Sequence, residues 1–65
     1  MQAHRRVRGA EKLSIYLHSV GCPISKSHIY TLMRRREIPF IKPSERILLF
    51  DLDAIDKWIE EKEVF

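Results

Sequence analysis

The residues best suited to bind a ligand lie within residues 26–36. With successive residues about 100° apart around a helix, Ser27, Thr31 and Arg34 share one face, opposite the apolar Ile29. Hydroxyl groups contact base edges or phosphate oxygens, and an arginine guanidinium binds guanine through two hydrogen bonds. This face therefore has the donors that are expected to contact the major groove of double-stranded DNA.

Further polar residues flank this face, and we include them among the predicted DNA contacts: Ser25, Lys26, His28, Tyr30 and Arg35. Lys26 stands in the first turn, where a positive charge opposes the helix dipole, so an anionic partner would explain its presence. An ordinary solvated surface uses the same residue types and is the alternative. The run from Arg34 to Arg36 also stabilises a helix C-terminus without any ligand. We expect Arg34 to face DNA and leave the roles of Arg35 and Arg36 open.

A second group of predicted contacts surrounds a turn between two β-prone runs. Lys42, Ser44 and Arg46 would place two cations and a hydroxyl at the tip of a hairpin, which could follow the DNA backbone or occupy a minor groove. Glu45 lies between them and weakens the electrostatic attraction. An ordinary exposed turn is the alternative.

A third basic group lies at the N-terminus, where the chain is polar and lacks clear periodicity. Its members are Arg5, Arg6 and Arg8. Two interpretations are equally open for this stretch, an arm that follows a minor groove and a disordered tail.

Three amphipathic segments must position these groups. From about Ala10 the apolar residues recur at i, i+3, i+4 and i+7, as Leu13, Tyr16, Leu17 and Val20. This spacing predicts a helix with one apolar face. Gly21 suits the left-handed position after a helix, and Pro23 prevents the helix from resuming.

Ser25 begins the second segment as a predicted N-cap, because its hydroxyl can accept a backbone N–H two or three residues later. Ile24 just before it is available for a staple-like contact. The helix is expected to run to about Arg35, and its apolar side consists of Ile29, Leu32 and Met33. Pro39 closes this region, because the residue before a proline disfavours helix.

Residues 40–59 predict a hairpin followed by a third helix. Runs at 40–42 and 47–50 flank a turn that contains Pro and Ser. Asp51 fits the cap of the last helix, whose apolar residues are Leu52, Ile55, Trp58 and Ile59. Phe50 and Trp58 are expected in the core.

The order helix, turn, helix, hairpin, helix predicts a mainly α fold with a small β-hairpin, a winged helix-turn-helix. None of the helices is long enough to be stable alone, so all three must share one core. We expect a flexible basic arm at residues 1–9, the DNA-binding domain at 10–62 and a C-terminal tail at 63–65.

The charge distribution agrees with this division. The chain has 65 residues and a formal net charge of +3. Residues 1–36 carry eight Lys or Arg and one Glu, a charge of +7, whereas residues 37–65 carry four Lys or Arg and eight Asp or Glu, a charge of −4. A basic half of this kind favours a polyanionic partner. The short length allows one small domain with little room for an enzymatic cleft.

Other chemistry is not indicated. The sequence has three histidines, His4, His18 and His28, and a single cysteine, Cys22. Their spacing does not match that of metal ligands. No phosphate-binding loop or nucleophile motif is present, so we expect no metal, no cofactor and no enzymatic activity. No apolar run approaches the roughly 20 residues of a membrane span. A cytoplasmic protein that does not bind membranes is expected.

Five short segments together resemble a known family, and they are residues 24–30, 36–40, 42–44, 49–51 and 55–59. They contain a capped Ser-Lys-Ser helix, a Glu-Ile-Pro sequence, a hairpin ending in Phe and an acidic helix with Trp. This pattern resembles the excisionase-type DNA-binding domain, a winged helix-turn-helix related to mercury-resistance regulators and common in conjugative transposons and prophages. The resemblance covers about residues 10–62.

The resemblance implies that the second helix occupies the major groove and that the wing tip touches the neighbouring minor groove. The three residues selected by helical spacing match the groove-facing positions, and Arg46 matches the basic wing residue. This sequence departs from the family at two places. Many members have Gly where this chain has Arg36, and the turn at residues 21–23 is longer than in the shortest members.

We therefore expect a sequence-specific double-stranded DNA-binding protein that acts as an architectural factor in the excision of a mobile element. Candidate partners are an integrase or recombinase and further copies of the chain on DNA, at a bacterial nucleoid. A transcriptional regulator of a prophage or conjugative transposon, the DNA-recognition domain of a phage packaging subunit and a protein–protein adaptor are the alternatives. For the adaptor, one of two side-chain pairs would face the partner: Ile47 with Leu49, or Leu48 with Phe50.

Overall fold

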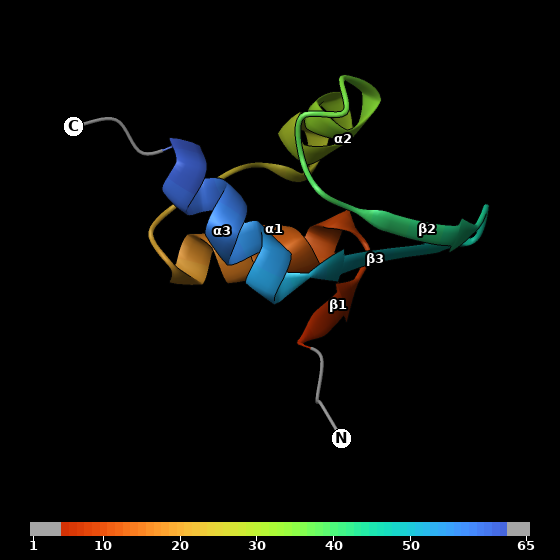
Figure 1. The fold of residues 1–65 in the computed structure, drawn as a ribbon, viewed down its shortest axis with the longest axis horizontal. Coiled ribbons are helices and arrows are strands. Elements are labelled where there is room, and N and C mark those ends of the chain that lie inside the picture. Colours follow the sequence, from red (N-terminus) through yellow and green to blue (C-terminus); the bar gives the residue numbers. More distant parts are fainter. Residues whose placement is uncertain (1–4, 63–65) are drawn as a thin grey trace.

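The computed structural model describes residues 5–62 (Figure 1). The elements follow in the order β1 (Arg6–Arg8), α1 (Ala10–Ser19), α2 (Lys26–Arg34), β2 (Ile41–Ser44), β3 (Ile47–Asp51) and α3 (Leu52–Lys62). The three helices and the hairpin confirm the predicted winged helix-turn-helix, in which β2 and β3 form the wing. Residues 1–4, which include His4, and the predicted tail at 63–65 lie outside the described residues.

A single apolar core lies where α1, α2, α3 and the sheet meet. Eight hydrophobic residues are buried in it: Ala10, Leu13, Leu17, Ile29, Ile38, Phe50, Leu52 and Ile55. The apolar spacing predicted most of this set, since α1 contributes three of these residues and α3 contributes two. Val20 is an exception, because α1 ends at Ser19 and leaves the Val20 side chain 47% exposed. The core is therefore built from all three helices at once, and each helix depends on the others for burial.

The two aromatic residues expected in the core differ in their surroundings. Phe50 on β3 is fully buried, as predicted. Trp58 on α3 packs against the core but stays partly exposed, and its indole N–H donates a 2.6 Å hydrogen bond to the Glu37 carbonyl. This bond ties α3 to the segment that follows α2. Trp58 therefore helps to hold the end of α2 in place.

Within the arm predicted at residues 1–9, the described residues 5–9 are ordered against the domain. Arg6–Arg8 form β1, which pairs antiparallel with β3, and the strand order in the sheet is β1-β3-β2. Val7 lies opposite Phe50 and packs against the core. Three residues are too few to show the alternation by which a strand is recognised, and β1 forms because β3 offers an open edge to pair with. The folded domain thus includes residues 5–9.

The wing has a defined inner and outer face. Leu48 packs against the core beside Phe50, whereas Leu49 lies opposite Ile41 on the other face of the sheet. Of the two pairs considered for an adaptor, Leu48 with Phe50 therefore lies on the side of the sheet that faces the core, although Leu48 is only half-buried. Within residues 5–62, the helices are all too short or too polar to cross a membrane.

Candidate nucleic-acid interface

α2 begins as the sequence predicts. The Ser25 hydroxyl accepts a 3.2 Å hydrogen bond from the His28 backbone N–H, and the half-buried Ile24 packs against the core just before this cap. Ile29 is the only fully buried residue of the helix, and Leu32 and Met33 pack beside it. With this side buried, the opposite side of α2 is exposed, and it carries Ser27 and Arg34.

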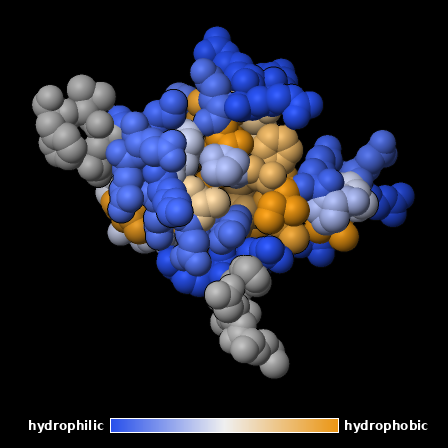
Figure 2. Space-filling view, in the orientation of Figure 1, coloured by the Kyte–Doolittle hydropathy of each residue, from blue (hydrophilic) through white to orange (hydrophobic). Residues whose placement is uncertain are grey.

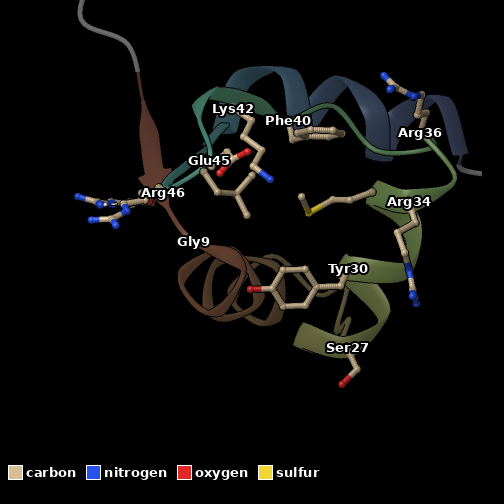
Figure 3. A pocket seen from close by; sticks show the side chains of 12 residues that line it. Gly9, Ser27, Tyr30, Arg34, Arg36, Phe40, Lys42, Glu45 and Arg46 are labelled. Carbon is tan, nitrogen blue, oxygen red and sulfur yellow. Dashed lines mark hydrogen bonds between the residues drawn. The ribbon is translucent and has the colours of Figure 1, made fainter.

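A concave surface with a volume of about 990 Å³ lies between α2, the wing and the end of β1 (Figure 3). Five cationic residues line it: Arg8, Arg34, Arg36, Lys42 and Arg46. Glu45 is the one acidic residue that lines it, so the concave surface has an excess of positive charge. Such an arrangement attracts a polyanion and raises its local concentration.

The floor of the concave surface is apolar. It is formed by the side chains of Tyr30, Met33, Phe40 and Leu48. Figure 3 shows the Tyr30 ring and the Lys42 side chain directed into the concave surface. Ser27 and Arg34 project from α2, and Arg46 projects from the tip of the wing. Figure 2 shows the same contrast, with hydrophobic residues between α2 and the wing and hydrophilic residues on both flanks.

Arg8 is the member of the N-terminal group that reaches this surface. Its guanidinium donates a 3.4 Å hydrogen bond to the Arg46 backbone carbonyl. The Gly9 N–H next to it donates to the Leu48 carbonyl at 2.9 Å, which holds the end of β1 against the wing. The sheet therefore brings two basic groups together that are almost forty residues apart in the sequence.

Arg5, which the sequence also predicted as a DNA contact, makes several contacts within the domain. Its guanidinium lies 2.9 Å from the Asp53 carboxylate and 3.3 Å from that of Asp56, and it donates a 3.0 Å hydrogen bond to the Tyr16 hydroxyl. The hydrogen bond with Tyr16 raises the pKa of Arg5. The hydrogen bond to Asp56, followed by burial, raises the pKa of Tyr16 above its ordinary value of 10.0. Arg5 thus connects the N-terminal segment to α1 and α3.

The other predicted residues, on α2, on the wing and at the start of β1, do not line the concave surface. Exposed residues in this group are Ser25, Lys26, His28, Arg35, Ser44 and Arg6. Thr31 is half-buried, and its hydroxyl donates a 3.2 Å hydrogen bond to the Ser27 carbonyl one turn earlier. Arg35 forms the C-cap of α2 and lies 3.9 Å from Glu37. Because the Ser25 hydroxyl caps α2, the presence of serine at this position is explained without any ligand.

Sequence patterns selected Tyr30 but not Arg36 or the other three residues of the apolar floor as parts of the surface. Arg36 follows the cap of α2, and its backbone conformation decides where its side chain lies. Met33, Phe40 and Leu48 were predicted only as core or strand residues, and they do pack against the core while they also line the concave surface. Within residues 5–62, no group of three or more His, Cys, Asp or Glu side chains could hold a metal ion.

The fold and the basic concave surface define the class of protein as a winged helix-turn-helix. The chain belongs to the helix-turn-helix domain family, whose sequence model matches residues 22–63. This match covers α2, the wing and α3, and with them most of the concave surface. Membership of this family indicates DNA binding. No curated protein and no solved structure gives a significant match to the chain.

Proposed function

We propose that the protein binds a specific double-stranded DNA site through the concave surface and acts there as an excisionase-type architectural factor in the recombination of a mobile element. One observation carries the DNA-binding proposal: five cationic residues from α2, its following loop, the wing and β1 line one concave surface. They lie beside the exposed side of α2, opposite the buried Ile29. The protein would bind and shape DNA and would leave the chemistry to a recombinase.

The residues divide into two roles. Arg34 and Ser27 project from α2, where they would contact base edges in the major groove. Lys42 and Arg46 on the wing, with Arg8 behind them, would contact the backbone or the neighbouring minor groove. Lys26, exposed in the first turn of α2, would contact a phosphate. Base contacts set the preferred sequence, and phosphate contacts set the register of the protein on the duplex.

The architectural role rests on the resemblance to excisionase-type domains, and the distribution of charge supports it. Asp53, Glu60 and Glu61 are exposed on α3, and none of them lines the concave surface. An acidic helix outside the DNA interface would be free to contact an integrase or another copy of the chain. A transcriptional regulator of the same element would use the same DNA interface, so the two functions differ only in the events after DNA binding.

The DNA-binding proposal is tested by the salt dependence of affinity. If about four to six phosphates are neutralised, a plot of log affinity against log salt has a slope of about −4 to −5. Arg34→Ala is expected to relax the preference at one base position, at a cost of about 1–3 kcal/mol. Lys26→Ala is the matched control and should weaken binding to all sequences alike. A flat salt response of the parent protein would contradict DNA binding.

The architectural role is tested with DNA from the end of the element that carries the gene. Bending of this DNA on binding, together with stimulation of excision by the neighbouring integrase, is the expected result. Binding that represses a promoter without any effect on excision would favour the transcriptional regulator instead.

A further inference from the structure

Two helices of this chain end in the same hydrogen-bonded turn. At the end of α1, the Gly21 N–H donates to the His18 carbonyl at 3.3 Å and the Cys22 N–H donates to the Leu17 carbonyl at 2.9 Å. This pattern needs a left-handed residue after the cap, and Gly21 supplies it with φ 79°. Glycine is the usual residue at this position because it has no Cβ to clash in that conformation.

α2 ends with the same pair of bonds around an arginine. The Arg36 N–H donates to the Met33 carbonyl at 3.0 Å, and the Glu37 N–H donates to the Leu32 carbonyl at 2.9 Å. Arg36 has φ 55°, and among the described residues it is the only one other than glycine with a positive φ. A branched or long side chain in this conformation is strained. Strained backbone tends to occur where a side chain has a functional role.

The position of the Arg36 side chain is an independent observation. Arg36 and Arg34 both line the concave surface, whereas Arg35 between them does not. Within residues 5–62, the Arg36 guanidinium has no hydrogen bond or ion pair, although Arg35 lies 3.9 Å from Glu37. Figure 3 shows Arg34 and Arg36 leaving the end of α2 in opposite directions. The two guanidinium groups therefore lie on different sides of the end of α2.

We propose that Arg36 is a further DNA contact, which binds a backbone phosphate beside the groove that Arg34 faces. The inference deepens the proposed function and rests on it. A guanidinium is well suited to this contact, because its fork of N–H donors matches the oxygens of a phosphate. Arg36 would hold the end of α2 on the duplex without reading the sequence.

The test compares Arg36→Gly with the parent protein on a specific duplex and on an unrelated duplex. Glycine relieves the strained backbone, so the melting temperature should rise by about 4 °C. The removed phosphate contact should make the salt slope less steep by about 0.9, which is about an eightfold loss of affinity at 0.1 M salt. Both duplexes should lose affinity to the same extent. A variant that folds more stably and binds more weakly cannot owe its lost binding to unfolding.

Three further variants separate charge from backbone conformation. Arg36→Asn introduces an uncharged residue that tolerates the left-handed conformation. It should reduce the slope of log affinity against log salt as much as Arg36→Gly does, whereas Arg36→Lys should keep the parental slope. Lys57→Ala removes an exposed cation on α3 that does not line the concave surface, and it should leave the slope unchanged. If Arg36→Gly keeps the parental slope while Arg34→Ala still loses base preference, the inference is wrong and the proposed function stands. If the parent itself shows no salt dependence, the proposed function fails.

Discussion

The Tyr16 hydroxyl on α1 donates a 2.5 Å hydrogen bond to the Asp56 carboxylate on α3. The same hydroxyl accepts a 3.0 Å hydrogen bond from Arg5, whose guanidinium carbon lies over the Tyr16 ring, 5.7 Å from its centre. The Arg5 carbonyl also accepts a 2.7 Å hydrogen bond from the Leu52 N–H. These contacts fix the beginning of β1, and β1 carries Arg8 to the concave surface. A cluster outside the interface therefore positions one of its cations.

Tyr16→Phe is expected to weaken this cluster while it keeps the aromatic ring. The loss of a hydrogen bond at a partly exposed site should lower the free energy of unfolding by about 1 kcal/mol. Urea denaturation followed by circular dichroism measures this change. The Tyr16 side chain does not line the concave surface, so DNA affinity should stay within about twofold of the parent. An unchanged urea midpoint would show that the cluster adds nothing to stability.

The same pair of proteins also tests the pH dependence. The hydrogen bond to Asp56, and then burial, raise the pKa of Tyr16 above 10.0 in the folded state. The unfolded chain therefore loses the Tyr16 proton first as the pH rises, so folding stability falls with pH in that range. The stability difference between the parent and Tyr16→Phe should be constant below about pH 10 and shrink above it. A difference that grows above this pH would contradict the assigned hydrogen bond.

Ser25 allows capping to be separated from DNA contact. Ser25→Ala removes the acceptor for the His28 N–H and should cost about 1 kcal/mol of folding stability. Ser25→Asp keeps a good cap and should retain that stability. Under the proposed function, the added negative charge at the exposed start of α2 should weaken DNA binding through repulsion of phosphates. Parental affinity of a stably folded Ser25→Asp would place this end of α2 away from DNA.

Ile29 is expected to control the attachment of α2 to the domain. Ile29→Val removes one methyl group from a fully buried site and should cost about 1 kcal/mol. Ile29→Ala should cost about 3 kcal/mol, which is most of the stability of a domain of this size. Thermal denaturation should show a folded Ile29→Val and a largely unfolded Ile29→Ala. A fully folded Ile29→Ala would mean that α2 is held by Leu32 and Met33 instead.

Arg8 and Arg6 form a matched pair for the contribution of β1 to DNA binding. Both are exposed arginines on one strand, and only Arg8 lines the concave surface. Arg8→Ala should make the slope of log affinity against log salt less steep by about 0.9, whereas Arg6→Ala should leave it unchanged. Equal effects of the two variants would show that β1 acts only through its general positive charge.

Local patterns were sufficient to predict much of the fold. The Ser25 cap, the left-handed Gly21 and the apolar spacing of α1 and α2 depend on residues within a few positions of one another. Asp51 also acts as predicted, since its carboxylate accepts a 3.1 Å hydrogen bond from the Asp53 N–H at the start of α3. β1 had no comparable signal. Its three residues become a strand only through pairing with β3, more than forty positions away.

The candidate site divides in the same way. Helical spacing alone selected Ser27 and Arg34, because opposite faces of a helix follow directly from the order of its residues. The amino-acid sequence thus determined which face of α2 is polar, where its charges lie and how the helix starts. Three features depended on the folded chain. Arg8 lies close to Arg46, Arg5 makes a hydrogen bond with Tyr16, and Arg36 lines the concave surface. The physical reason is that these contacts join segments distant in sequence, or depend on a backbone conformation that an arginine does not favour by itself.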